Sequence, residues 1–162
     1  MKNKIFKISI FSLLSIYNCG FSQSKFSFHE YDKFITETKS HTTETVDLRI
    51  ENLINNIQPS VYIEFDGVKI YGSQPICLFT NTNNFSNILN FSFDKENIEI
   101  INIRINNTND LINDLDFSIL FNFKKLKYIY IVSDLKCNDS DILKLITHIG
   151  NYTVLYKIAQ NL

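Results

Sequence analysis

The sequence predicts an α/β or α+β protein in which an N-terminal helix and a β-hairpin lead into a β-α-β-α-β segment. Three observations support this fold class. Apolar residues follow helical spacing near residue 50, a glycine turn separates two apolar runs near residue 66, and strand-like and helix-like segments alternate after residue 96. Strands that alternate with helices at this spacing are joined by right-handed crossovers and lie parallel.

The first part of the chain, residues 1–22, is typical of a secretory signal peptide. The run Ile8–Tyr17 is apolar apart from three serines, and at about ten residues it is half the length that a membrane-spanning helix needs. The segment before this run contains no acidic residue and three basic residues, Lys2, Lys4 and Lys7. We therefore expect an exported protein, periplasmic or extracellular, with no transmembrane span in the mature chain. An ordinary N-terminal helix is the alternative.

The expected cleavage point follows Ser22, because Gly20 and Ser22 then stand at the −3 and −1 positions. The mature chain would begin at Gln23. The ending Gly20–Gln23 resembles signal peptides common in Bacteroidota. A lipid anchor on Cys19 is the alternative, although Asn18 is bulky where a bacterial lipobox has a small residue.

The net charge of the chain limits the classes of molecule that it can bind. The whole chain has a formal net charge of −1, and loss of the three N-terminal lysines would make the mature chain more acidic. Such a chain lacks the basic surface that nucleic acids or anionic membranes attract. We therefore expect no nucleic-acid partner, and another protein is the more suitable one.

Two cysteines remain after cleavage, Cys77 and Cys137. In an oxidising compartment such a pair favours a disulfide over a metal site. A Cys77–Cys137 bridge would stabilise the fold by about 4 kcal/mol if it only constrained the unfolded chain. Two buried free thiols are the alternative.

In the first half of the mature chain we expect a lead-in, a helix, a hairpin and two further strands. Residues 23–44 form a polar lead-in, and a single domain of residues 45–162 follows. A helix is expected over 46–57, ended by Pro59. A hairpin is expected over 61–71, with Asp66-Gly67 as its two-residue turn. Further strands are expected at 76–79 and 89–93, separated by an asparagine-rich loop.

The second half alternates strands and helices. Strands are expected at 98–105, 126–132 and 152–158 because these segments are rich in β-branched and aromatic residues. Helices are expected at 108–122 and 139–149, where apolar residues recur at helical spacing. Gly150 suits the end of the second helix.

These strands carry a similar pattern of residues. The first reads Ile98-x-x-Ile101-x-Ile103-x-x-Asn106, the second begins at Leu126 and ends on Asp134, and a third begins at Thr153 and ends on Asn161. Residues 98–161 thus resemble leucine-rich-repeat units, whose strand is written L-x-x-L-x-L-x-x-N. The resemblance implies a continuous apolar core and an exposed sheet face. A generic α/β domain with three parallel strands is the alternative.

The residues between the core positions indicate a candidate binding face. Tyrosine and arginine side chains on an open face suit protein recognition. The candidate binding residues are Arg104, Tyr128, Tyr130 and Lys157. The alternative is that a helix or the hairpin covers this face, which would place Ile100, Tyr128 and Leu155 in a core.

Motifs for catalysis and for cofactors do not occur in the sequence. His41 and Glu44 stand one helical turn apart and could in principle hold a metal, but such residues in a polar segment are more often simply solvated. His148 suits the last turn of a helix, and Asn138, Asp139 and Asp141 lack the spacing of a calcium loop. We therefore expect no catalytic residue, no metal ligand and no cofactor.

These observations favour an exported, non-catalytic protein that binds another protein or associates with the cell envelope. An exported hydrolase with a site assembled from scattered residues is one alternative. An immunity-type protein that neutralises a toxin is another. A pocket that joins a histidine to two carboxylates would favour the hydrolase.

Overall fold

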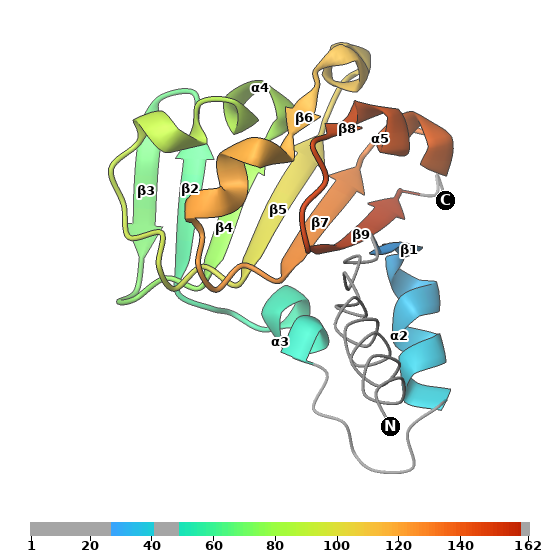
Figure 1. The fold of residues 1–162 in the computed structure, drawn as a ribbon, viewed down its shortest axis with the longest axis horizontal. Coiled ribbons are helices and arrows are strands. Elements are labelled where there is room, and N and C mark those ends of the chain that lie inside the picture. Colours follow the sequence, from blue (N-terminus) through green and yellow to red (C-terminus); the bar gives the residue numbers. More distant parts are fainter. Residues whose placement is uncertain (1–26, 41–48, 160–162) are drawn as a thin grey trace, which may run out of the picture.

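The computed structural model describes residues 27–40 and 49–159, which form a central seven-stranded sheet with helices on both faces (Figure 1). The predicted signal peptide, Cys19 and His41 lie outside the described residues. The sheet has seven strands in the described part, β1 (Ser27–Glu30), β2 (Ser60–Glu64), β3 (Gly67–Tyr71), β4 (Cys77–Asn81), β5 (Ile100–Ile105), β7 (Tyr128–Ser133) and β9 (Thr153–Ile158). The α/β fold class is confirmed.

The strand order is β1-β9-β7-β5-β4-β2-β3, so from β2 to β9 the sheet follows the order of the chain. Neighbouring strands pair in parallel, except that β2 and β3 form an antiparallel hairpin. A second, two-stranded sheet pairs β6 (Leu115–Asp116) with β8 (Ile146–Thr147). From β4 to β9, each parallel connection therefore returns the chain to the strand next to the one it left.

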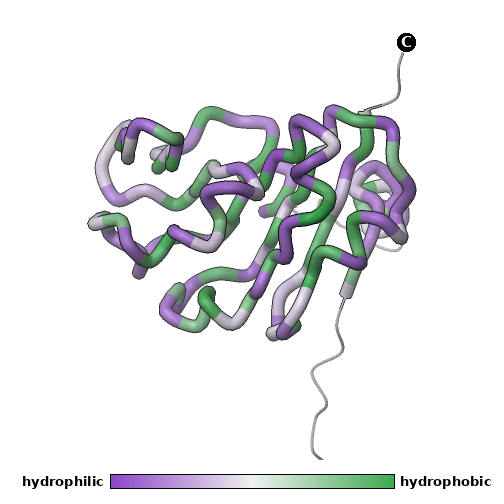
Figure 2. The backbone as a smooth tube through the Cα atoms, turned by 90° about the horizontal axis from the view of Figure 1, so that it is seen from above, coloured by the Kyte–Doolittle hydropathy of each residue, from purple (hydrophilic) through white to green (hydrophobic). Residues whose placement is uncertain are grey.

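Short helical segments connect the parallel strands on one face of the sheet. They are α4 (Thr82–Phe85), η1 (Ile88–Asn90), η2 (Thr108–Ile112), η3 (Phe117–Asn122) and α5 (Asp139–Leu145), the η segments being 3₁₀ helices. Phe85, Phe117 and Ile142 from these segments pack against Ile101 and Ile129 of the strands. This face holds the larger apolar core, and Figure 2 shows how hydrophobic and hydrophilic residues alternate along the chain.

Helices α2 (Tyr31–Ser40) and α3 (Arg49–Asn55) lie on the opposite face. Their buried residues form a smaller core with the sheet, made of Tyr31, Ile35, Ile50, Leu53, Cys77, Ile100, Tyr130 and Leu155. The alternative expectation for this face, that a helix covers part of it, is therefore correct. Among the described helices, none is both long enough and apolar enough to cross a membrane.

The N-terminal segment is more ordered than its polar composition indicates. Residues 27–40, expected as part of a lead-in, form β1 and α2. The Glu30 carboxylate accepts hydrogen bonds from the backbone amides of Asp32 and Lys33 and so caps the start of α2. β1 pairs with β9, which gives the backbone of this segment a place in the sheet.

The hairpin forms as expected, but its turn lies one residue earlier than predicted, which shifts the pairing of its strands by two residues. Ile63 pairs with Val68 and Glu64 with Gly67, so that Phe65 and Asp66 occupy the turn. This register places Val68 on the same face as Ile63, against the larger core, and leaves Phe65 in solvent.

Three helix or strand predictions are wrong. Residues 108–122 form η2, β6 and η3 rather than one helix, because i, i+3 spacing also fits 3₁₀ turns. Residues 88–90 form η1 in place of a strand. α5 ends at Leu145, where the chain enters β8, so Gly150 does not cap it.

The three similar strand segments align differently from the sequence-based alignment. β5 and β7 pair as expected, with Ile101 opposite Ile129. In β9, however, Ile129 is opposite Val154 rather than Tyr156. The two-residue difference keeps every side chain on its expected face, because side chains alternate along a strand.

Candidate binding groove

The half of the sheet face that α2 and α3 leave uncovered forms a groove of about 500 Å³. It lies over the carboxyl-terminal parts of β2, β4, β5 and β7, and Ile54 of α3 closes one side. Side chains that alternate along these strands supply its floor, and the residues just after the strands supply its rim.

One row of paired residues crosses the groove floor. Tyr62 pairs with Phe79, Phe79 with Asn102, Asn102 with Tyr130, and Tyr130 with Leu155. The Tyr62 and Phe79 rings stack at 4.6 Å between centroids. Both are only partly buried, so they offer apolar ring surface to a ligand.

Tyr130 forms the end of the groove nearest α2. Its ring lies 5.3 Å from that of Tyr31, and Asn55 of α3 donates a 3.3 Å hydrogen bond to the Tyr31 hydroxyl. Burial raises the pKa of the Tyr130 hydroxyl, and the neighbouring Tyr31 and Asp32 add to this effect. Tyr130 is therefore a neutral, fixed wall of the groove.

Arg104 stands on the next row of the face and reaches solvent at the rim. Its guanidinium donates from Nε to Asp134 Oδ2 at 2.6 Å and from Nη2 to Oδ1 at 3.2 Å. The hydrogen bonds and charge of Asp134 hold the pKa of Arg104 above its usual value. The Asp134 side chain is thus engaged by Arg104 on the neighbouring strand.

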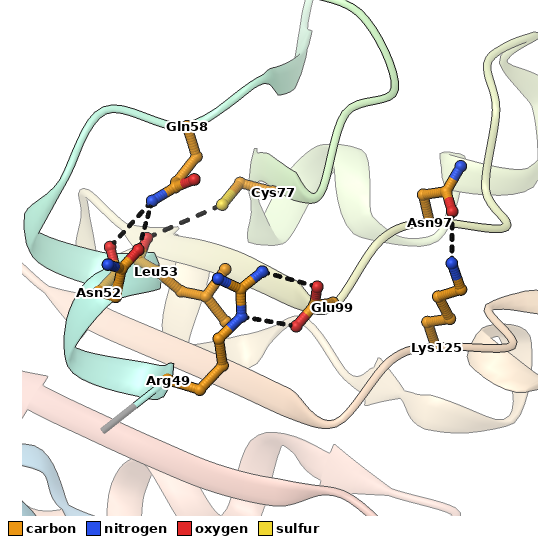
Figure 3. Close-up of polar contacts among 8 residues, drawn as sticks. All are labelled: Arg49, Asn52, Leu53, Gln58, Cys77, Asn97, Glu99 and Lys125. Atoms are coloured by element: carbon orange, nitrogen blue, oxygen red, sulfur yellow. Dashed lines mark hydrogen bonds and ion pairs between the residues drawn. The ribbon is translucent and has the colours of Figure 1, made fainter. Parts of the chain in front are cut away.

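Helix α3 is fixed to the base of the groove by polar contacts (Figure 3). Arg49 forms a two-point ion pair with Glu99, the residue before β5. At the other end of the helix, the Gln58 side chain donates to the Asn52 carbonyl at 3.2 Å and to the Asn52 side chain at 2.7 Å. These contacts hold Ile54 beside the floor.

The structure places all four predicted binding residues on this face. Tyr130 lines the groove and Arg104 its rim. Tyr128 lies on the row below, half-buried against the smaller core. Lys157 pairs with Asp32 of α2 at 2.9 Å, at the far side of Tyr130. Arg104 and Tyr130 are thus brought together, whereas Tyr128 and Lys157 support the helices.

Sequence reasoning missed Tyr62 and Phe79. The strands that contain these two residues were expected, and the alternation of side chains along each strand shows which residues of that strand share a face. The missing information was that β2 pairs with β4 and β4 with β5, which aligns both rings with Asn102.

The predicted Cys77–Cys137 disulfide is wrong in this structure, in which both are free thiols. Cys77 lies in the smaller core, where its Sγ approaches the Leu53 carbonyl at 3.8 Å. Cys137 packs against the larger core and contacts Ser133 Oγ at 3.5 Å. The sheet separates the two residues. Burial raises the pKa of the Cys77 thiol to about 11.

The other polar groups considered from the sequence lie away from the groove. The expectation that His148 ends a helix is wrong, because α5 ends at Leu145 and His148 follows β8, where it pairs with Asp116 of β6 at 3.0 Å. Asn138 and Asp141 form the capping box of α5. Within residues 27–40 and 49–159, no three histidine, cysteine or acidic side chains converge as metal ligands would.

Comparison of the chain with protein-family models, with curated proteins and with solved structures gives no match.

Proposed function

We propose that the chain is an exported, non-catalytic module that binds another protein through the groove. The observation that carries the proposal is the partly exposed Tyr62–Phe79 pair on a sheet face whose other half is covered. Arg104, paired with Asp134, adds a largely exposed guanidinium at the rim. Aromatic and arginine side chains dominate the binding energy of protein interfaces, which supports this choice of ligand.

The rigidity of the floor also supports the proposal. Six paired strands carry the groove and its flanks, and their backbone hydrogen bonds fix the spacing of the side chains. A preformed floor loses little conformational freedom when a partner binds.

Capture with matched variants tests the groove. The mature chain is immobilised beside Phe79→Ala, Arg104→Glu and the control Phe121→Ser, whose residue is exposed on η3 at the other face. We expect the wild type and the control to retain the same proteins from a cell-envelope extract. The two groove variants should bind the purified partner at least about tenfold more weakly, a loss typical of interface hot spots.

Equal binding by all four chains would contradict the proposal. A toxin among the retained proteins would identify the chain as an immunity-type protein, one of the alternatives for the same groove.

Export is part of the proposal and has its own test. The intact mass of protein purified from its native envelope should correspond to a chain that begins at Gln23. A mass increase that maps to Cys19 would indicate a lipid anchor instead. A mass that includes residues 1–22 would contradict export by signal cleavage.

We also propose that the parallel part of the sheet is a short leucine-rich-repeat-like array. The agreement between strand order and chain order supports this resemblance, as do the connections gathered on one face. In such an array the uncovered sheet face is the binding face, which is where the groove lies.

A further inference from the structure

The structure assigns to the groove one specific anchor, an uncharged tyrosine or tryptophan side chain of the partner, seated over Asn102 between Phe79 and Tyr130. This inference rests on the proposed function and specifies what the partner inserts. Three features support it: the space over Asn102, the hydrogen-bonding groups of Asn102 and the charges at the rim.

The space arises because Asn102 is the one small residue in its row. Phe79 and Tyr130 flank it on the two neighbouring strands. Adjacent strands are about 4.8 Å apart, so the two aromatic side chains stand roughly 9.6 Å apart at their bases. Ile54 closes the end of this slot toward α3. A flat ring fits between two aromatic walls, and aromatic pairs are favoured beyond their buried area.

The base of the slot offers a hydrogen-bond acceptor. The Asn102 side-chain amide donates to the Leu78 carbonyl at 3.5 Å. In the described part of the chain, no donor reaches Asn102 Oδ1. A tyrosine hydroxyl or a tryptophan indole N–H can donate to this oxygen, whereas a phenylalanine or leucine side chain would leave it without a partner.

The charged side chains at the groove rim form ion pairs with one another. Arg104 pairs with Asp134, and Lys69 pairs with Glu64 and Asp66. A charged anchor side chain would find no free counter-ion at the groove and would lose its hydration. A neutral aromatic side chain matches this environment.

Fragment binding tests the anchor directly. ¹H–¹⁵N spectra of the mature chain are recorded with N-acetyl-tyrosinamide or N-acetyl-phenylalaninamide. We expect both to shift the signals of Asn102, Phe79 and Tyr130. One hydrogen bond corresponds to about a three- to tenfold preference for the tyrosine derivative.

Two variants separate the hydrogen bond from general effects. Asn102→Leu should retain ring binding and remove the preference for the tyrosine derivative. Asn109→Leu, at an exposed position on η2, should keep it. Equal affinities in the wild type, a preference that survives in Asn102→Leu, or shifts on the other face of the sheet would each overturn the inference.

The purified partner distinguishes this inference from the proposed function. Asn102→Phe fills the slot and should weaken partner binding at least tenfold, while thermal unfolding shows that the variant is folded. If Arg104→Glu abolishes binding and a folded Asn102→Phe does not change it, the groove binds a protein but the anchor inference fails. If neither variant weakens binding, the proposed function itself fails.

Discussion

Arg49 and Glu99 join α3 to the beginning of β5 through two hydrogen bonds, Nε to Oε2 at 3.0 Å and Nη2 to Oε1 at 2.7 Å. The carboxylate is mostly buried, whereas the guanidinium is partly exposed. Two-point arginine–carboxylate pairs are stronger than single-point pairs, although exposure weakens them. This pair therefore fixes α3, and with it the side of the groove formed by Ile54.

Replacement of Glu99 by glutamine should lower the free energy of unfolding by about 1 kcal/mol at pH 7, measured by urea denaturation. The hydrogen bonds from Arg49 lower the pKa of Glu99 in the folded protein. The pair thus stabilises the fold above the unfolded pKa of about 4.3, and this contribution disappears as the pH falls through the folded value. The difference between wild type and Glu99→Gln should shrink accordingly below pH 4.

Glu96→Gln is the matched control, because Glu96 and Lys124 form an ion pair in which both side chains are largely exposed. We expect no measurable change in stability for this variant. Equal losses for Glu96→Gln and Glu99→Gln would mean that the Arg49–Glu99 pair has no special role.

Asp110 should be the carboxylate on which the larger core depends most. It is fully buried on η2 and accepts hydrogen bonds from the backbone amides of Asn106 and Asn107 and from the Asn83 side chain. Asp110→Asn should cost about 2 kcal/mol, since one acceptor oxygen is lost and a buried donor is left unpaired. Asp114→Asn, at an exposed position, should change stability little.

The pH dependence of Asp110 follows from the same contacts. Burial by itself raises the pKa, but the hydrogen bonds from Asn106, Asn107 and neighbouring side chains outweigh it and lower the pKa. Asp110 therefore stabilises the protein above the unfolded pKa of about 3.9, and the stabilisation is lost on acidification through the folded value. A destabilising effect of Asp110→Asn that is as large at pH 2 as at pH 7 would contradict this assignment.

The two thiols should differ in reactivity. Folded protein prepared to begin at Gln23 and treated with iodoacetamide should be modified first at Cys137, which is partly exposed. Cys77 should react slowly, because it is buried and its pKa is raised to about 11, which leaves little thiolate. Mass spectrometry after unfolding without reductant should show two modifiable thiols. A disulfide-linked peptide containing both cysteines would contradict the structure.

The hairpin should require glycine at position 67 only because of the backbone conformation there. Its φ is +131°, and an added Cβ would meet no atom within 4 Å. Gly67→Ala should therefore cost about 1–3 kcal/mol of unfolding free energy from backbone strain, with no contribution from a steric clash. The neighbouring Phe65→Ala, whose side chain is fully exposed, should stay within about 0.5 kcal/mol of wild type. Equal stabilities of the three proteins in thermal unfolding would argue against strain at Gly67.

The strands were predictable because their signals are local. Ile100–Ile105 and Tyr128–Ser133 are rich in β-branched and aromatic side chains, and most of their residues are buried. Alternation along each strand also placed Arg104 and Tyr130 on one face before any pairing was known. The composition of a strand and the face of each residue are therefore readable from the sequence.

The elements that were missed depend on distant contacts. α2 buries only Tyr31 and Ile35 in a polar segment, and its stability comes from packing on strands more than ninety residues later in the chain. The register of β9 is likewise set by its neighbour β7, not by its own apolar pattern. Tertiary packing decides such cases, and no local pattern records it.

The agreement between strand order and chain order sets the width of the groove. Each strand between β2 and β9 adds one spacing of about 4.8 Å without changing the path of the others. In the proposed leucine-rich-repeat-like array, duplication or loss of one strand-and-connection unit would therefore widen or narrow the groove in a fixed step and leave the flanking units nearly intact. Evolution of such a protein toward larger or smaller partners can therefore proceed by gain or loss of whole strand-and-connection units. Side-chain substitutions would then adapt the groove surface to each partner.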